Sequence, residues 1–323
     1  MVKIADVLAR VGRQSRNALP YLFMEEAITR VDKQKIYVGG QAVIEGVMMR
    51  GPEYIATAVR EPSGNIVIKK ERVTSIGDRF PILKKPLIRG VIALYESLVY
   101  GMKSLAFSAQ ASGEEGEEMS SKEIGLTMVF SLVMAVVLFL AIPTYGAKFI
   151  PGVADNPFRL NIVEGLLRLF IFLIYIYGIS RAKDIQRVFQ YHGAEHMTIF
   201  TYEANEELCV ENVQKHSRLH PRCGTNFLLI VMIVSIIVFA FLGWPSLLER
   251  ILSRIILMPV VAGLSYEVIR LAGRSDNAIV QWAIKPGLWL QLLTTRKPSP
   301  DQIEVAIKAL EAVRPDEAHA YEL

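Results

Sequence analysis

Long stretches without a charged side chain constrain this chain more than any other feature. Ile124–Ile142 carries no charge and is followed by Pro143, and Phe227–Trp244 is also uncharged. A helix of about 20 apolar residues crosses the hydrocarbon core of a bilayer. Such a helix satisfies its backbone hydrogen bonds internally, as lipid requires. We therefore expect both segments to be transmembrane helices.

Three further apolar segments contain charged or interrupting residues. We expect Ile162–Ile179 and Ile251–Val268 to cross the membrane, with partners for the charges near their ends. Ala278–Leu293 is too short and too interrupted to span, and we expect it to be interfacial or re-entrant, with Trp282 and Trp289 near the headgroups. The charged residues of these segments are Glu164, Arg168, Arg254 and Glu267.

The region before the first span has a different character. Charged residues make up 21% of the chain, so much of it must lie in water. Short β-rich runs separated by glycine and proline occupy residues 35–73, and the loop between Val59 and Ile66 predicts a β-hairpin. Pro86–Ala111 has apolar residues at helical spacing. We expect a small α+β region here, over residues 35–122.

These patterns predict a membrane α-helical protein of about four transmembrane helices, with a small cytosolic α+β domain near the N-terminus. Residues 1–34 read as amphipathic helices without a signal sequence, 123–295 as the membrane domain, and 296–323 as a C-terminal amphipathic helix. The loop 181–226 is rich in basic residues, whereas the loop between the first two spans has few. Basic loops stay in the cytosol, so both termini and loop 181–226 are expected there.

Four of the five histidines lie between His192 and His220. On a helix, His192 and His196 project from one face and can share a metal ion. Glu195 stands beside them and could act as a general base on a metal-bound water. The order His-x-x-Glu-His is the inverzincin pattern, and Glu203 falls on the same face two turns further on.

The second half of loop 181–226 supplies more ligand types. His216 and His220 repeat the four-residue spacing, and Cys223 stands just before an apolar helix, where a thiol pKa tends downward. Together with His192 and His196, one or more of these residues would make a zinc site with Glu195 or Glu203 as the carboxylate. Two other readings stay open: histidines bound to lipid phosphates at the membrane surface, and ordinary buried histidines.

A glycine-rich stretch, Gly39–Pro52, fits neither a Walker nor a dinucleotide-binding loop. Its four glycines suggest close backbone approach to another group, and Glu45 and Arg50 are candidates for positioning a substrate. The alternative is a tight strand–turn structure with a methionine-rich core.

Five motifs occur in order along the chain: Gly39–Gly51, Tyr191–His196, His220–Thr225, Ala262–Glu267 and Pro286–Gln291. Together they resemble the YqhQ-like family of bacterial membrane proteins. That family is of unknown function and is generally described as predicted metal-dependent enzymes. The resemblance runs from about Gly39 to the C-terminal helix, and it implies a bacterial plasma-membrane protein. Met197 stands where the family is expected to prefer lysine.

Two functions follow as hypotheses. The first is a metal-dependent membrane hydrolase at the cytosolic surface, with a divalent ion, zinc by preference, and a lipid-linked substrate or membrane peptide. The alternative is a non-enzymatic membrane scaffold or insertion factor with a structural His/Cys metal site. The net charge of +4 suits a bilayer of anionic lipid, and no nucleic-acid-binding signature is present.

Overall fold

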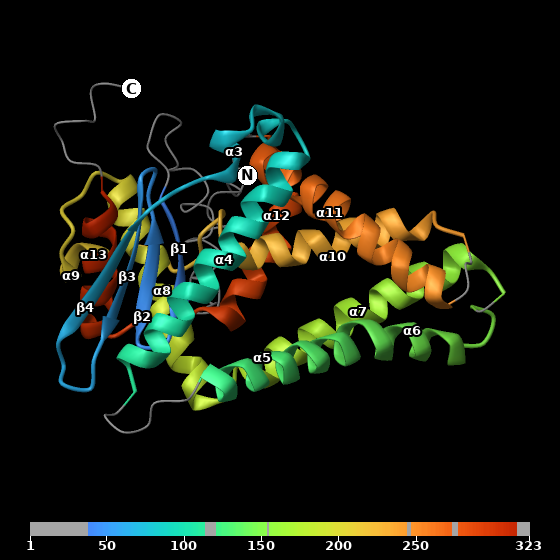
Figure 1. Ribbon diagram of the computed structural model, residues 1–323, viewed down its shortest axis with the longest axis horizontal. Coiled ribbons are helices and arrows are strands. Elements are labelled where there is room, and N and C mark those ends of the chain that lie inside the picture. Colours follow the sequence, from blue (N-terminus) through green and yellow to red (C-terminus); the bar gives the residue numbers. More distant parts are fainter. Residues whose placement is uncertain (1–37, 114–120, 154, 244–246, 273–276, 315–323) are drawn as a thin grey trace, which may run out of the picture.

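A computed structural model describes residues 38–113, 121–153, 155–243, 247–272 and 277–314. The amphipathic helices expected at residues 1–34 lie outside these ranges, as does the end of the C-terminal tail. Figure 1 shows a small sheet at one end of the molecule and a set of long helices that extend away from it.

The sheet confirms the β-rich region expected near the N-terminus. Its four antiparallel strands follow chain order, and each pairs with the next. The expected hairpin joins the last two strands, with Arg60 opposite Ile66. The strands are β1 (Gly39–Val43), β2 (Gly46–Arg50), β3 (Tyr54–Arg60) and β4 (Ile66–Arg72).

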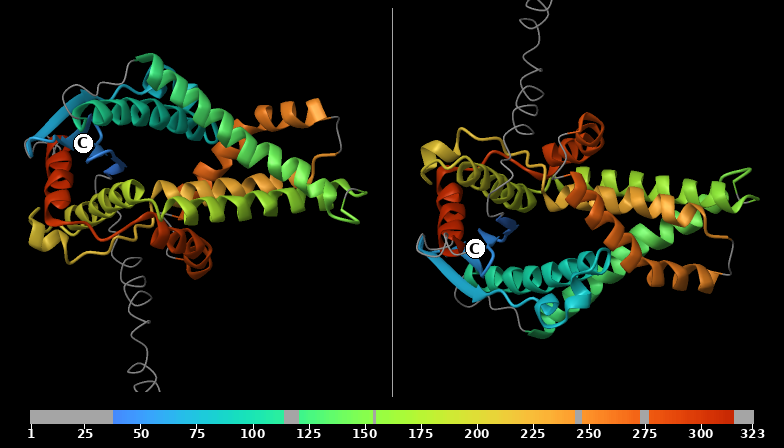
Figure 2. Two further views of the ribbon diagram at one scale, coloured as in Figure 1. Left: turned by 90° about the horizontal axis from the view of Figure 1, so that it is seen from below. Right: turned by 90° about the horizontal axis from the view of Figure 1, so that it is seen from above.

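Helices cover both faces of the sheet, and they come from three distant parts of the chain. Helix α4 (Ile88–Ala111) lies on one face, where Thr57 donates a hydrogen bond to Ser104. Helices α8 (Lys183–Glu203) and α13 (Pro300–Val313) pack on the other. Figure 2 shows α4 and α8 on opposite sides of the sheet. Residues expected in separate regions of the sequence therefore share one core.

The main core lies between the sheet and helices α8 and α13. Because side chains alternate along a strand, one face of β2 and β3 points toward these helices. Helix α13 begins with Pro300 after a capping box of Ser299 and Gln302, which fixes where its apolar face starts. The buried residues of this core include Val47, Met49, Ala56, Ala58, Tyr191, Ala194, Met197, Ile303 and Leu310.

Three helices in the described residues are long and apolar enough to cross a membrane: Gly125–Phe149, Pro157–Ile179 and Leu252–Ala272. The first comprises α5 (Ser121–Val136), a π-helical segment (Val137–Ala141), α6 (Ile142–Gly146) and a terminal 3-10 turn (Ala147–Phe149). The others are α7 (Pro157–Ile179) and most of α11 (Leu247–Ala272). Large side chains such as Leu126 and Phe130 are exposed on the first helix, as lipid-facing residues would be.

Four spans were expected, but one of the two uncharged segments forms a shorter helix. Phe227–Trp244 corresponds to α10 (Gly224–Ala240), which is apolar but only 17 residues long. Conversely, the charged segment Ile251–Val268 lies within a helix that is long enough to span. Helix α12 (Ala278–Thr294) also has 17 residues and contains Pro286, in agreement with the segment expected not to cross.

The charges of two apolar helices, α7 and α11, meet in one buried cluster beside α6. Glu164 is 1% exposed at its side chain and forms ion pairs with Arg168 and Arg254. Thr144 donates a hydrogen bond to the same carboxylate and accepts one from Arg254. Arg168 also donates to the carbonyl oxygen of Phe139 in the π-helical segment, and such segments alter the regular carbonyl pattern of a helix. Glu164, Arg168 and Arg254 are therefore partners of one another, whereas the fourth charge, Glu267, forms an ion pair with Arg89 of α4.

We predict that this cluster is needed for the fold. Glu164→Leu leaves two buried arginines without their shared carboxylate and should lower the free energy of unfolding by about 3–5 kcal/mol. Glu304→Gln is the control, because Glu304 forms an ion pair with Arg60 at the surface, where such pairs are worth about 0–1 kcal/mol. Unfolding in detergent followed by circular dichroism would measure both. Equal losses in the two variants would contradict the prediction.

Candidate metal centre

Helix α8 carries three of the candidate residues on its buried face. His192, Glu195 and His196 lie within two turns, and Glu195 and His196 are buried. Gly193 lets this helix approach the chain after α12, because a Cβ at this position would lie 2.1 Å from the carbonyl oxygen of Arg296. Helix α8 therefore lies close to the segment that follows the apolar helix α12.

Backbone carbonyls orient both histidine rings. The Nδ1 atom of His192 lies 2.8 Å from the carbonyl oxygen of Thr294, and Nδ1 of His196 lies 2.5 Å from that of Arg218. In each case Nδ1 must carry the proton, because a carbonyl oxygen can only accept. Nε2 of each ring is then left as a lone-pair donor. Metal-binding histidines are commonly oriented in this way.

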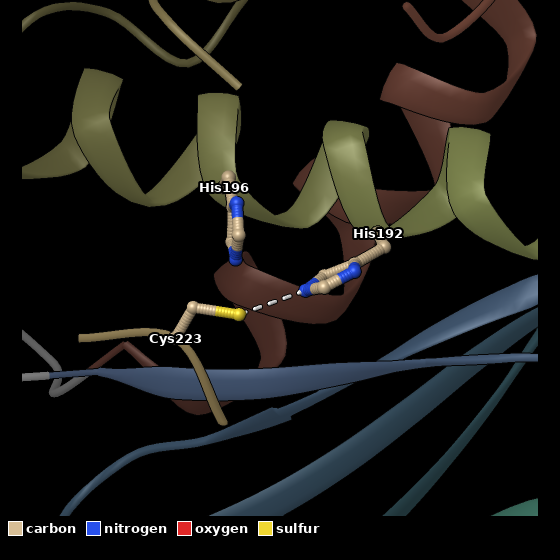
Figure 3. A group of neighbouring side chains, drawn as sticks. All are labelled: His192, His196 and Cys223. Atoms are coloured by element: carbon tan, nitrogen blue, oxygen red, sulfur yellow. Dashed lines mark hydrogen bonds between the residues drawn. The ribbon is translucent and has the colours of Figure 1, made fainter. Parts of the chain in front are cut away.

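Cys223 completes a compact group of three donors. Its Sγ atom lies 3.2 Å from Nε2 of His192, and the donor atoms of His192, His196 and Cys223 all lie within 4.8 Å of one another. Figure 3 shows the two rings and the thiol converging from α8 and from the start of α10. Of the four histidines in the sequence cluster, the structure brings these two together with the cysteine.

The environment of Cys223 favours a thiolate. Burial raises the pKa of this thiol, but the neighbouring His196 and hydrogen bonds from Thr225 outweigh burial and lower it. One of these bonds is donated by the backbone N–H of Thr225, because Cys223 is the N-cap of α10. The thiolate is the form that binds metals.

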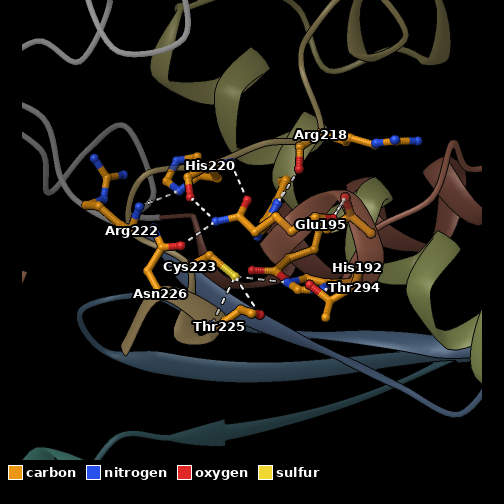
Figure 4. A network of polar contacts seen from close by, with 12 residues as sticks. His192, Glu195, Arg218, His220, Arg222, Cys223, Thr225, Asn226 and Thr294 are labelled. Atoms are coloured by element: carbon orange, nitrogen blue, oxygen red, sulfur yellow. Dashed lines mark hydrogen bonds and ion pairs between the residues drawn. The ribbon is translucent and has the colours of Figure 1, made fainter. Parts of the chain in front are cut away.

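Glu195 lies beside the three donors. Its carboxylate is 3.9 Å from Nε2 of His192 and is almost fully buried. Gly40 of β1 makes room for this side chain, because a Cβ there would lie 3.0 Å from Cγ of Glu195. Burial raises the pKa of Glu195 to about 8. Figure 4 shows Glu195 with His192 and Cys223 in one network of polar contacts.

A cavity of about 280 Å³ opens beside this group. Glycines 39 and 40 of β1 form part of its wall, so the glycine-rich stretch does approach another group closely, as its composition suggested. The group is thus enclosed on the side of α8 and open on the side of the cavity. The lining residues are Val38, Gly39, Gly40, His192, Glu195, His196, Ile199, His220, Arg222, Cys223 and Gly224.

His220 and Glu203 form a second group at the edge of the cavity. Nε2 of His220 lies 3.7 Å from Oε2 of Glu203, and Glu203 forms an ion pair with Arg222. Burial raises the pKa of Glu203, but His220 and Arg222 outweigh it and lower that pKa. The ring of His220 is 5.5 Å from that of His196, centre to centre. These two predicted ligands therefore stand next to the three donors rather than among them.

His216, the remaining candidate ligand, lies apart from the three donors. Its Nε2 atom is 3.1 Å from a carboxylate oxygen of Glu206, and its ring stacks on Phe200. The repeat of the four-residue spacing at His216 and His220 does not place the two rings in one site, because residues 214–223 are not helical.

The two proposed substrate-positioning residues are engaged elsewhere. Glu45, in the left-handed region with φ of 50°, forms an ion pair with Arg187. Arg50 forms an ion pair with Glu96 of α4. Neither residue lines the cavity. Both tie the sheet to the helices that cover it.

Several residues that position the candidate ligands could not be identified from the chemistry of their side chains in the sequence. Gln291 of α12 accepts from the backbone N–H of His220 and donates to its carbonyl oxygen, both at 2.8 Å. It also donates to Asn226, 2.9 Å away. Gln291 lies in one of the motifs shared with the YqhQ-like family, which was the available signal. Thr294 and Arg218 act through carbonyl oxygens, for which side-chain identity gives no signal.

Comparison with known proteins agrees with the motif resemblance. Residues 85–316 match the family described as protein of unknown function (DUF1385). The chain is 39% identical over 287 residues to the uncharacterized protein YqhQ of Bacillus subtilis (strain 168), across 84% of this chain and 90% of that protein. No solved structure matches. The chain therefore belongs to the DUF1385 family of proteins of unknown function.

Proposed function

We propose that this protein is a metal-dependent membrane hydrolase and that His192, His196 and Cys223 hold its zinc ion. The observation that carries the proposal is the convergence of three metal-binding atoms beside an open cavity and a buried carboxylate. Catalytic zinc sites have three protein ligands and one open position, whereas structural sites are closed by four.

The donor geometry fits zinc. With Zn–N near 2.0–2.1 Å and Zn–S near 2.3 Å, tetrahedral coordination separates nitrogen and sulfur by about 3.6 Å. The distance of 3.2 Å between Nε2 of His192 and Sγ of Cys223 is slightly shorter, and a small side-chain movement would open it. Two imidazoles and one thiolate are ligands that zinc prefers over magnesium or calcium.

Glu195 is placed to act as the general base. Zinc supplies Lewis-acid activation of water and of a carbonyl or phosphoryl oxygen. Glu195 would accept the proton of the attacking water and later return it to the leaving group. Its burial disfavours the charged form, and a nearby cation favours it, so metal binding would shift this carboxylate toward the basic form.

The position of the cavity favours a substrate at the membrane surface. Two of its walls are the start of α10 and the helix α8 that rests on the end of α12, so it lies where apolar helices meet the sheet. A lipid-linked molecule or a membrane peptide could reach the site from the bilayer. The basic loop charges favour the cytosolic side of a bacterial plasma membrane.

The alternative is a scaffold or insertion factor with a structural metal. One observation favours it: the three donors join α8 to the start of α10, and His192 is also bonded to the end of α12. A metal there would fasten these elements together whether or not it performed chemistry. The role of Glu195 separates the two functions.

The first prediction concerns metal content. The purified protein should carry about one zinc ion per chain, and His192→Ala and His196→Ala should each lose it, because a site of three protein ligands cannot spare one. His216→Ala is the matched control, since this histidine pairs with Glu206 away from the site. Elemental analysis would measure all three. Full occupancy in the His192→Ala/His196→Ala double variant would refute this ligand assignment.

The second prediction separates enzyme from scaffold. Glu195→Gln keeps the shape of the side chain and removes its basicity, so the variant should fold and keep its zinc but lose at least about a hundredfold in turnover. The lipids or membrane peptides that accumulate in a strain without the protein should accumulate equally in a strain with this variant. Mass spectrometry of membrane extracts would detect them.

Glu206→Gln is the control for this experiment, because the carboxylate of Glu206 bonds to His216, away from the three donors. Normal extracts from the Glu195→Gln strain, with zinc retained, would reject the hydrolase and favour the scaffold. Absence of any accumulation in the strain without the protein would also count against a hydrolase.

The third prediction concerns orientation. In a variant without native cysteines, single cysteines at Lys122 and Asn205 should react from the cytosolic side, and one at Asp155 from the opposite side. The reason is that one apolar helix separates Lys122 from Asp155, and a second separates Asp155 from Asn205. Labelling with a membrane-impermeant maleimide in intact and opened cells would test this. Opposite sides for Lys122 and Asn205 would overturn the orientation.

A further inference from the structure

A second cavity, of about 300 Å³, lies on the loop between α9 (Val210–Val213) and α10. Lys215, Ser217 and Arg218 form its polar wall, and Leu219 and Leu292 form its apolar wall. Apart from His216, none of these residues was a candidate ligand of the metal centre. The cavity combines cationic and hydroxyl groups with an exposed leucine of α12, the helix expected at the membrane surface.

The positive charge at this cavity is not neutralised by the described part of the chain. Arg218 is half-buried, and no described carboxylate forms an ion pair with it. Arg296 lies close enough that its charge, after burial, contributes to lowering the pKa of Arg218. Arg296 donates to the carbonyl oxygen of Ser180, and its Nε atom is buried without a hydrogen-bond partner.

The other charges at the rim of the cavity leave the positive charge in excess. Lys215 donates to the neutral side chain of Asn212, 2.8 Å away. Glu206, whose carboxylate lies 3.1 Å from Nε2 of His216, brings one negative charge to the rim against the two positive charges of Lys215 and Arg218. The two half-buried guanidinium groups repel each other through space, and burial makes that repulsion more costly than in water. An anion in the cavity would remove the cost.

We propose that this cavity binds the phosphate group of an anionic phospholipid. Arginine and lysine are the side chains that recognise phosphate, arginine through its planar fork of donors. The apolar wall at Leu219 and Leu292 favours a lipid over a soluble phosphate ester, because it gives the first carbons of the lipid a surface to cover. Basic pockets at the cytosolic ends of membrane helices bind anionic headgroups in this way.

The segment that lines this cavity also holds the metal centre. Figure 4 shows the side chain of Arg218 pointing away from the polar network, while its carbonyl oxygen faces it. That oxygen accepts the hydrogen bond from Nδ1 of His196. A phosphate bound to the guanidinium would therefore steady the backbone that orients a metal-binding ring. The lipid site itself does not depend on the proposed hydrolase function.

Native mass spectrometry of the full-length protein in detergent tests the proposal. The protein is titrated with phosphatidylglycerol and with phosphatidylcholine of the same chain length. Wild type should retain one phosphatidylglycerol in preference to phosphatidylcholine. Arg218→Gln should weaken that binding about tenfold, because it removes a charge-assisted hydrogen bond. Arg218→Lys should recover part of it.

Arg181→Gln is the matched control, because Arg181 is an exposed basic residue that stacks on Tyr177 away from the cavity. It should bind as wild type does. Equal weakening by Arg181→Gln and Arg218→Gln, or none by Arg218→Gln, would show that general surface charge attracts the lipid and would overturn the site.

Two further arms keep the test decisive. If Arg218→Gln fails to fold, judged by size exclusion and its thermal transition, Lys215→Gln replaces it, since Lys215 is exposed and its ammonium group donates to the neutral side chain of Asn212. That variant should weaken binding about threefold; no change would overturn the site. Inorganic phosphate is added as a competitor, and displacement of the lipid at equal concentration would overturn a phospholipid in favour of a soluble phosphate group.

Discussion

The burial of one face of α8 determines the rest of this structure. This face packs on the sheet, on α13 and on the chain after α12, so Glu195 and His196 lose almost all contact with water. Burying a carboxylate, two imidazoles and a thiol in one place is costly unless each finds a partner. The two ring nitrogens that face backbone carbonyls meet that need on one side. On the other side the donors face each other, which is how a site for a cation is arranged.

The long helices were predictable because hydropathy acts locally. An apolar run of sufficient length indicates a helix whatever lies around it, and Ile124–Ile142 and Ile162–Ile179 both proved to be parts of such helices. Short β-rich runs and turn residues made β3, β4 and the hairpin that joins them predictable for the same reason. The length of α10 was less predictable. Its apolar segment continues to Trp244, but the described helix ends at Ala240.

The packing partners could not be predicted from the sequence. The sheet formed by residues 39–72 needs α13, more than 200 residues later, to cover it. No sequence pattern in either segment indicates that the two pack together. The same limit applies to Glu45 and Arg50, whose charges suggested a role in substrate binding. Their partners, Arg187 and Glu96, lie on α8 and α4, and only the three-dimensional arrangement shows that both charges are already used.

The residues of the candidate site also fall into two groups: some could be predicted from local spacing, and others depend on the three-dimensional arrangement. His192 and His196 were correctly expected to project from one helix face, because helical spacing fixes that relation. The choice among His216, His220 and Cys223 depends on a non-helical loop, where spacing fixes nothing. The loop places Cys223 with the two histidines because that residue caps α10 and its thiol accepts a backbone hydrogen bond. Cys223 could be suspected from its place before an apolar helix, but not selected.

The loop 214–223 therefore contacts helix α8 on one side and lines the basic cavity on the other. On one side, the carbonyl oxygen of Arg218 and the thiol of Cys223 face the side of α8 that carries His192 and His196. On the other, the side chains of Lys215 and Arg218 face the basic cavity. The side chain of Gln291 of α12 forms two hydrogen bonds with the backbone of His220 in this loop. A displacement of this loop by about 1 Å would disturb both the ring orientation and the cavity wall, and catalytic geometry is sensitive to errors of that size. The end of the apolar helix α12 is thus connected to the group of His192, His196 and Cys223 through Gln291 and the carbonyl oxygen of Thr294, so a movement of α12 would change the geometry of that group.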